Sequence, residues 1–295
     1  MKDVFTLFRL FRPKQWIKNL FLFLPLFFAG KLFEMKAWRL TLAGFVAFCL
    51  ASSAVYILND LMDISHDRQH PTKRYRPLAS GSVSPSWALG LALGLGAVAF
   101  LVAFPLPTLF IYILSFYVIQ NVAYSLRLKH IPILDVALVS LGFVWRILAG
   151  GVLGSIPVSN WIVLMTFLLA LFLGFAKRRD DVLIFLESGK KMRRAVDGYN
   201  LEFIHMSMVL SAGVVLVCYI MYTLSEEVVA RWHTDKLYLT AFPVLLGVVR
   251  YLQLTLVEGK SADPTAVLLR DFFIQVTLAA WVIMFYLIIY RHRFL

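Results

Sequence analysis

The sequence predicts an all-α membrane protein, a bundle of nine transmembrane helices with an active-site cavity that opens on the cytoplasmic side. Of its 295 residues, 60% are hydrophobic, and the mean hydropathy is +0.78, well above that of an average soluble domain. Its apolar runs approach the ~20 residues that cross a bilayer as a helix, and they are too long for barrel strands. Its ionisable residues gather between these runs. We expect the whole chain, 1–295, to form a single transmembrane domain.

Nine apolar segments are long enough to be helices that cross a membrane. Several are interrupted by proline or glycine, which a helix bundle tolerates. The glycines within them predict close packing between helices, namely Gly94, Gly96, Gly150, Gly151 and Gly154. The nine segments cover roughly 16–33, 38–60, 86–104, 107–125, 132–153, 159–177, 203–224, 237–254 and 272–290.

The distribution of lysine and arginine predicts the orientation. With the N-terminus inside, 21 of the 29 basic residues fall on the cytoplasmic side and seven outside, and Arg146 lies within a helix. Cytoplasmic connections of membrane proteins carry the excess of basic residues. We therefore expect a cytoplasmic N-terminus, an external C-terminus and an active site that faces the cytoplasm.

The net charge of +12 favours negatively charged binding partners. In a membrane protein it indicates attraction to anionic lipid and an anionic substrate. No zinc-ligand spacing or RNA-binding signature supports a nucleic-acid partner. Cys49 and Cys218 both lie within apolar segments, so we interpret them as small buried hydrophobic residues.

A stripe of oxygen-bearing side chains marks the end of the second segment. Asn59, Asp63 and Asp67 follow one another at i, i+4 and i+8, and a helix with this spacing places all three on one face. Clustered oxygen ligands suit a hard divalent cation such as Mg2+. We predict that these three residues hold the metal and that Asp63 and Asp67 are catalytic. The alternative is a solvated cap with internal salt bridges.

Basic residues follow the stripe within ten positions and predict phosphate binding, since arginine can bind two phosphate oxygens at once. They are Lys73, Arg74 and Arg76. Further candidates lie at the cytoplasmic ends of other segments. Tyr124 and Lys129 close the fourth segment. Lys18 and Asn19 begin the first, where they either bind an anion or, with Trp16, anchor the chain at the membrane interface.

A second group of charges closes the sixth segment. Lys177 and Arg178 are expected to bind phosphate, and Asp181 is the candidate for a further catalytic acid, with Asp180 as the alternative. Lys177 and Asp181 are also spaced to form a local ion pair. Arg193, just before the seventh segment, completes the predicted substrate-binding set.

Two ionisable residues lie inside the fifth segment, where a charge requires a partner or a cavity. Asp135 and Arg146 are 11 residues apart and share a helix face. Asp135 lies near the cytoplasmic end, within reach of Lys129. For the deeper Arg146 the sequence leaves two roles open, substrate contact and stabilisation of the bundle.

These motifs carry a family resemblance. The segment 59–67, Asn-Asp-Leu-Met-Asp-Ile-Ser-His-Asp, matches the NDxxDxxxD pattern of the UbiA superfamily of intramembrane prenyltransferases. Within the superfamily, the chain most resembles the members that transfer a phosphoribosyl group to a polyprenyl phosphate in cell-wall biosynthesis. That likeness rests on residues 12–19, 70–81, 124–129 and 177–178.

The resemblance implies a UbiA-like enzyme of the bacterial inner membrane. Its donor would be 5-phosphoribosyl diphosphate, its acceptor a polyprenyl phosphate and its cofactor Mg2+. The resemblance does not fix the oligomeric state, and a homo-oligomer is one of the alternatives. The metal–diphosphate would be held by Asn59, Asp63 and Asp67, with phosphate contacts from Lys73, Arg74, Arg76, Lys177 and Arg178.

Two other functions compete with this one. A related enzyme could move a polyprenyl chain from its diphosphate to an aromatic acceptor with the same acidic cluster. A transporter would place ionisable residues along a pathway through the membrane. Here the charges crowd on one side, and only Arg146 is deep, so the enzyme reading is preferred.

Overall fold

The computed structural model describes residues 4–69, 72–189, 194–259 and 264–290, and every regular element in these ranges is helical. Eight helices of the described residues are long and apolar enough to span a membrane. The chain divides into two compact units, Met1–Val158 and Ser159–Leu295. The single transmembrane domain expected from the sequence stays a prediction.

The described residues of the first unit form ten helical elements. They are α1 (Val4–Phe11), η1 (Pro13–Phe23), α2 (Leu24–Phe28), α3 (Met35–Met62), α4 (Ile64–Gln69), η2 (Lys73–Tyr75), α5 (Pro85–Ala103), α6 (Thr108–Leu126), η3 (Leu128–His130) and α7 (Leu134–Gly154). The labels η mark 3-10 helices.

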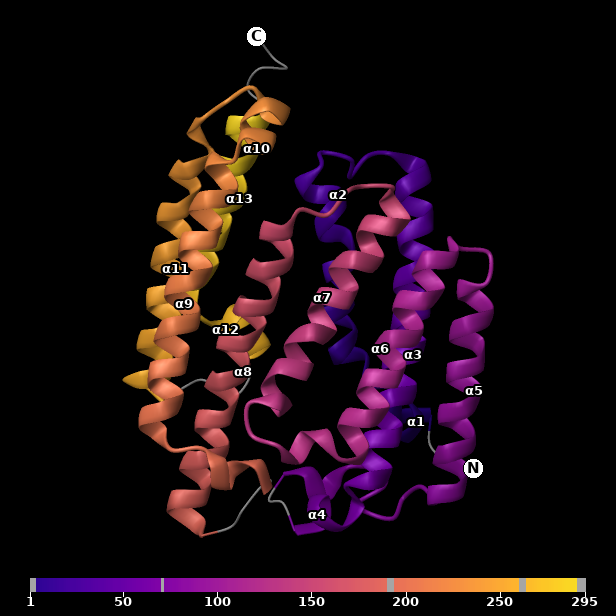
Figure 1. Cartoon of the computed structure of the whole chain (residues 1–295). Helices are drawn as coiled ribbons and strands as arrows, with labels where there is room; N and C mark the ends of the chain where they lie inside the picture. The colour runs from indigo at the N-terminus through magenta and orange to yellow at the C-terminus, as the bar shows by residue number, and fades with distance from the viewer. Residues whose placement is uncertain (1–3, 70–71, 190–193, 260–263, 291–295) are drawn as a thin grey trace. The chain divides into compact units, whose positions relative to one another are not determined.

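Helix α3 is the central element of this unit and packs against α5, α6, α7 and η1 (Figure 1). The core between them includes Phe48 of α3, Phe110 and Leu114 of α6, and Leu153 of α7, all at most 1% exposed. At 1.5 Å per residue, the 28 residues of α3 extend about 42 Å, which exceeds the ~30 Å of a hydrocarbon core. One end of α3 therefore reaches beyond the hydrocarbon, and its C-terminal end carries the acidic residues.

The first predicted segment, 16–33, is not one α-helix. Its chain forms the 3-10 helix η1 and then the five-residue α2, although 3-10 runs beyond three or four residues are uncommon. A Cβ on Gly150 of α7 would lie 2.1 Å from the carbonyl oxygen of Leu22. The tighter 3-10 winding and the missing side chain together let the η1 backbone lie directly on α7. Predicted close packing between helices is thus confirmed for Gly150 against η1 and for Gly154 against Leu26 of α2. Gly151 instead faces Ile156 and Val158, which follow α7 in the chain, and the prediction is wrong for Gly94 and Gly96, which have nothing within 4 Å.

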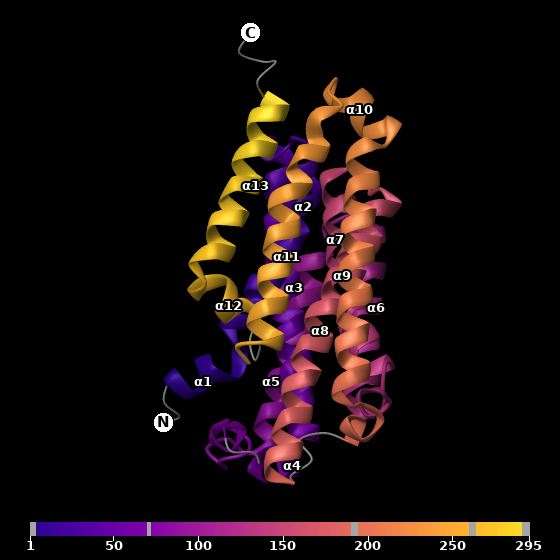
Figure 2. The same cartoon turned by 90° about the vertical axis from the view of Figure 1, so that its left-hand side faces the viewer.

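The second unit consists of α8 (Asn160–Ser188), η4 (Arg194–Gly198), α9 (Leu201–Leu224), α10 (Glu226–Trp232), η5 (Lys236–Thr240), α11 (Ala241–Leu256), α12 (Pro264–Arg270) and α13 (Phe272–Tyr290). Helix α9 packs on both α8 and α11, and α11 packs on α13 (Figure 2). A buried polar link crosses this unit, because the Tyr219 hydroxyl lies 2.6 Å from the Thr240 hydroxyl and accepts a 2.6 Å hydrogen bond from the Trp281 indole.

Candidate active site

The acidic residues lie where α3 ends and α4 begins. Helix α3 ends at Met62, and Asp63 caps it outside helical geometry (φ −99°, ψ 6°). The spacing of a helix nevertheless continues through the break. The Asp63 amide donates to the Asn59 carbonyl at 3.1 Å, and the Asp67 amide donates to the Asp63 carbonyl at 2.8 Å. The predicted i, i+4, i+8 relation therefore holds in the backbone, although two helices contribute to it.

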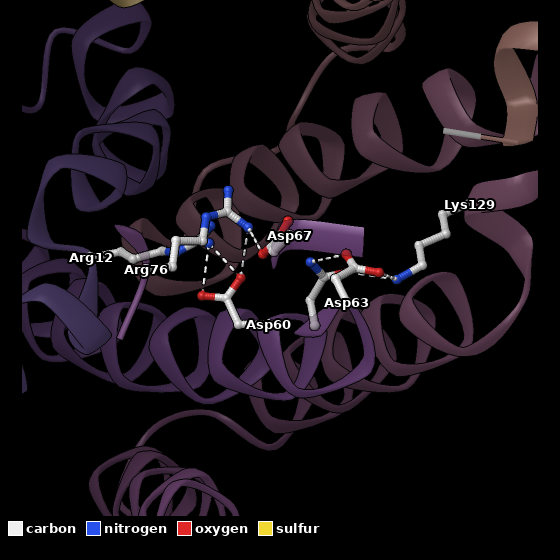
Figure 3. Close-up of polar contacts among 7 residues, drawn as sticks. Arg12, Asp60, Asp63, Asp67, Arg76 and Lys129 are labelled. Atoms are coloured by element: carbon white, nitrogen blue, oxygen red, sulfur yellow. Dashed lines mark hydrogen bonds and ion pairs between the residues drawn. The ribbon is translucent and has the colours of Figure 1, made fainter. Parts of the chain in front are cut away.

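One half of the cluster holds a lysine ammonium (Figure 3). Lys129, on η3, donates to Asp63 Oδ1 at 2.6 Å and to Asn59 Oδ1 at 3.3 Å. The Asn59 amide in turn donates to Asp63 Oδ2 at 3.1 Å, which fixes the orientation of both groups. Lys129 is only 6% exposed. Side-chain oxygens of Asn59 and Asp63, from adjacent turns, thus both contact the buried Lys129 ammonium.

The other half of the cluster consists of two carboxylates and two guanidinium groups (Figure 3). Arg12 Nη2 donates to both Asp60 oxygens, at 2.5 and 2.8 Å. Arg76 Nη1 bridges Asp60 Oδ1 at 3.0 Å and Asp67 Oδ2 at 2.7 Å. Two guanidinium groups thus face two buried carboxylates, and their charges balance.

These contacts test whether the predicted metal ligands fit a divalent cation. Among the residues that the structure describes, no three His, Cys, Asp or Glu side chains converge on one point. Asp63 and Asp67 face different cationic side chains. The Asn59–Asp63 oxygen pair does fit, because it binds a cation already and because Mg2+ commonly takes only one or two carboxylates beside water and substrate phosphates. The assignment of Asn59, Asp63 and Asp67 as metal ligands stays a prediction.

Arg12 and Asp60 were not among the predicted site residues. Arg12 adopts a left-handed backbone (φ 51°, ψ 55°) directly before the proline that begins η1. This conformation costs a residue with a Cβ about 1–2 kcal/mol and persists only where surrounding contacts hold it. The contact here is the ion pair with Asp60. The sequence offered one signal for Asp60, namely a carboxylate that lies within an apolar run.

A second polar cluster lies deeper in the first unit, around Arg146 of α7, which is 4% exposed. Its Nε donates to Asn19 Oδ1 at 2.7 Å, its Nη1 to the Gly142 carbonyl at 2.6 Å, and its Nη2 to the Tyr117 hydroxyl at 3.1 Å. Aromatic rings lie 4.8–5.8 Å from the guanidinium carbon, in Phe48, Tyr117 and Phe143. Asn19 is fully buried and holds η1 to α7 and, through Cys49 Sγ, to α3.

The remaining predicted residues of this unit take varied positions. Lys18 is half-buried on η1, next to Asn19 in the chain. Lys73 is half-buried, and Arg74 is exposed with its guanidinium 4.8 Å from the ring centroid of Tyr75. Tyr124 is half-buried on α6. The structure therefore brings Lys129 and Arg76 into the acidic cluster and places Lys18 and Asn19 in the deeper one.

The candidates of the second unit lie on α8. Arg178 is 4% exposed, and its Nη1 donates to Asp181 Oδ2 at 2.8 Å. An ion pair of Asp181 within its own helix therefore does form, here at i, i+3 with Arg178. Lys177 is exposed. Arg193 lies outside the described residues. The predicted roles of these residues in binding and catalysis stay predictions.

Comparisons with known proteins point to one group. The model of the UbiA prenyltransferase family matches residues 20–277. The chain is 34% identical to decaprenyl-phosphate phosphoribosyltransferase of Mycolicibacterium smegmatis, over 92% of this chain and 88% of that protein. It is 31% identical to the protein of the same name from Corynebacterium glutamicum, over 95% and 85%.

Two other similarities are more distant. The chain is 30% identical to 4-hydroxybenzoate octaprenyltransferase of Thiobacillus denitrificans, over only 43% of this chain and 44% of that protein. Among solved structures, a UbiA homologue from Archaeoglobus fulgidus bound to GPP and Mg2+ superposes with a TM-score of 0.73 at 18% identity. That match covers 96% of this chain and 99% of that one. It shows a shared fold.

Proposed function

Because the chain belongs to the UbiA prenyltransferase family, we propose that it transfers the 5-phosphoribosyl group of phosphoribosyl diphosphate to a polyprenyl phosphate and releases diphosphate. One observation carries this choice within the family. The identity to decaprenyl-phosphate phosphoribosyltransferases extends over more than nine-tenths of this chain, whereas the match to the octaprenyltransferase covers less than half. The word decaprenyl comes from the names of these relatives, and the proposal for this chain is a polyprenyl phosphate of the same class.

The reaction needs charge stabilisation more than proton transfer. The bond from the anomeric carbon to the diphosphate oxygen breaks, and a bond from that carbon to an oxygen of the acceptor phosphate forms. The acceptor is already an anion, so no side chain has to remove a proton. The charge that develops on the leaving diphosphate is best stabilised by cations fixed in advance. Buried Lys129 and half-buried Arg76 are held in this way by their carboxylate partners.

In this proposal Asn59, Asp63 and Asp67 would hold Mg2+, which would neutralise charge on the leaving diphosphate. Lys129 lies within hydrogen-bond distance of Asp63, and Arg76 within hydrogen-bond distance of Asp67. Both cations are therefore positioned to bind phosphate oxygens of a substrate at these carboxylates. Arg12 has a supporting role, because its ion pair keeps Asp60 neutralised and in place.

Lys73 and Arg74 extend the positive charge at the end of α3, and Tyr124 is assigned to the same substrate surface. From the second unit we assign Lys177, Arg178 and Arg193 to substrate phosphates and Asp181 to a catalytic role. Support for these assignments is their residue type and their place in the motifs of the family.

We place the protein in the bacterial inner membrane with its N-terminus and active site on the cytoplasmic side and its C-terminus outside. An external C-terminus requires an odd number of crossings. Eight α-helical spans supply an even number. The η1–α2 segment supplies the ninth, because eleven residues at about 2.0 Å and five at about 1.5 Å extend about 30 Å. Figure 1 shows α1 and α2 at opposite ends of the first unit.

Cysteine labelling tests this topology. In a variant in which both native cysteines are replaced, a cysteine at Ser82 should be shielded from an impermeant thiol reagent in intact cells, and one at Ser159 should react. The opposite pattern would place the acidic cluster outside the cell and contradict the proposal.

The function is tested with purified protein in detergent, Mg2+, radiolabelled phosphoribosyl diphosphate and a polyprenyl phosphate. We expect a labelled lipid, no product from folded Asp63→Ala or Asp67→Ala variants, and poor use of long-chain polyprenyl diphosphates as donors. If the protein instead forms prenylated 4-hydroxybenzoate from a polyprenyl diphosphate, it is a prenyltransferase for aromatic acceptors and the proposal is wrong.

A further inference from the structure

Arg146 lies deep in the first unit, and its hydrogen-bond partners do not neutralise its charge. It lies 12 residues into α7, about 18 Å along the helix axis and so near the middle of a membrane span. All three of its hydrogen-bond acceptors are neutral groups of Asn19, Gly142 and Tyr117. Among the described residues, no carboxylate forms an ion pair with it. A lone charge at membrane depth is costly and is typical of a functional site.

A second cation without a carboxylate partner lies close by. Lys18 of η1 directly precedes Asn19, whose side chain accepts the 2.7 Å hydrogen bond from Arg146, and Lys18 and Arg146 both act electrostatically on the Tyr56 hydroxyl. Arg12 also lies near Tyr56, with its guanidinium carbon 5.3 Å from the ring centroid, but Asp60 neutralises that charge. Within the part of the chain that the structure describes, Lys18 and Arg146 are thus two positive charges on either side of Asn19, and neither forms an ion pair.

This cluster begins about one helical turn from the acidic one along α3. Tyr56 lies four residues before Asp60, or about 6 Å along the helix axis, and Ser52, to which the Asn19 amide points, lies eight residues before it, or about 12 Å. Arg12 contacts both the Tyr56 ring and Asp60. Lys18 and Tyr56 are half-buried, whereas Arg146 and Asn19 are buried. A ligand would therefore approach from the side of Lys18 and Tyr56.

We propose that Arg146 and Lys18, with Tyr56 and Asn19 between them, bind a phosphate monoester one to two helical turns deeper than the acidic cluster. A phosphate monoester carries nearly two negative charges at neutral pH and three acceptor oxygens. It thus matches the charge of the two cations. The Arg146 guanidinium uses three of its five N–H groups in the contacts above, which leaves two for phosphate oxygens. Lysine supplies a point charge.

This inference rests on the proposed function, in which two substrates carry a monoester. One is the 5-phosphate of phosphoribosyl diphosphate, and the other is the phosphate of the lipid acceptor. Both present the same chemistry to the cluster, so the experiment has one arm for each source. Arg146→Gln and Lys18→Gln remove one charge each, Arg146→Lys keeps the charge, and Lys36→Gln on the exposed start of α3 is the matched control.

The donor arm measures competition with radiolabelled phosphoribosyl diphosphate by two probes. Ribose 5-phosphate carries the monoester alone, and inorganic diphosphate carries only the leaving group. If the site binds the donor, Arg146→Gln and Lys18→Gln should each weaken ribose 5-phosphate competition by about tenfold or more and leave diphosphate competition unchanged. Arg146→Lys should recover part of the loss.

The acceptor arm measures the dissociation constant of radiolabelled polyprenyl phosphate by equilibrium binding in detergent. If the site binds the lipid, this constant should rise by about tenfold or more in the same variants while donor competition stays unchanged. Variants that elute and melt like the wild type and change neither quantity would overturn the site. Should Arg146→Gln fail to fold, the half-buried Lys18→Gln gives the same reading.

Failure of the site and failure of the proposed function are distinguishable. The competition and binding measurements need no turnover. A wild-type protein that binds ribose 5-phosphate through Arg146 but makes no phosphoribosylated lipid would overturn the function and keep the site. A wild-type protein that makes the lipid, with unaffected Arg146 and Lys18 variants, would overturn the site alone.

Discussion

Replacing Lys129 by methionine should tighten the binding of a divalent cation at the acidic cluster. Its ammonium holds the Asp63 carboxylate and the Asn59 carbonyl oxygen, the two groups that fit a metal best. A metal that binds these oxygens has to displace the ammonium. Methionine has a similar length and no charge, so the variant removes the competing cation and leaves the two oxygens in place.

The structure indicates the size of this effect. The contact to Asp63 is 2.6 Å, and the Lys129 side chain is 7% exposed, so solvent screens it little. A hydrogen bond to a charged group contributes about 1.5–3 kcal/mol, which corresponds to about 10- to 150-fold in a dissociation constant. Because the Asp63 side chain is 24% exposed, the lower end applies, and we expect about tenfold tighter binding.

Titration with Mn2+ followed by electron paramagnetic resonance measures this affinity without turnover, since Mn2+ prefers the same oxygen ligands as Mg2+. Lys36→Met serves as the control, and Asp63→Asn should shift the affinity in the opposite direction. Turnover by Lys129→Met should fall all the same, because the leaving diphosphate loses a cation. Unchanged or weaker Mn2+ binding in Lys129→Met would refute the idea that this ammonium occupies the metal position.

Two further predictions concern the rest of the first unit. Arg76→Ala and Asp67→Asn should be non-additive, with a coupling of about 1–3 kcal/mol in a double-mutant cycle of unfolding free energy, because the two side chains meet at 2.7 Å; additive effects would contradict the ion pair. Gly150→Ala should lower the melting temperature strongly, because its Cβ would lie 2.1 Å from a backbone carbonyl oxygen. Gly94→Ala, in open space, should melt at or above the wild-type temperature, and equal melting of the two variants would contradict the close approach of η1 to α7.

The sequence allowed prediction of features that depend on local pattern. Apolar length alone located the eight long helices, and residue spacing located the Asn59–Asp63 pair, because backbone hydrogen bonds four residues apart keep that spacing across the helix break. The 3-10 helix was not predicted, because length and hydropathy are similar for an α-helix and a 3-10 helix. Its backbone lies against a glycine of α7 that is more than 100 residues away in the chain, a contact that local pattern does not reveal.

Partners distant in the chain could not be predicted from one sequence. Arg12 contacts Asp60 across 48 residues, and Arg146 contacts Asn19 across 127. Spacing within a helix gives the face on which a side chain lies, but it does not say which helix that face meets. For this reason the spacing placed Asn59 and Asp63 next to each other, whereas the partners of Arg146 could not be predicted.

The winding of η1 also fixes the direction in which its side chains point. A 3-10 helix turns about 120° per residue, so Trp16, Asn19 and Leu22 stand above one another, and Lys18 is in phase with Gln15 and Phe21. An α-helix turns about 100°, so rewinding the segment would swing Asn19 by about 60° and Leu22 by about 120° relative to Trp16. It would also shorten the eleven residues by about 5.5 Å. The amide of Asn19 would then face away from Arg146. The 3-10 winding of η1 thus determines whether its polar side chains face those of α7.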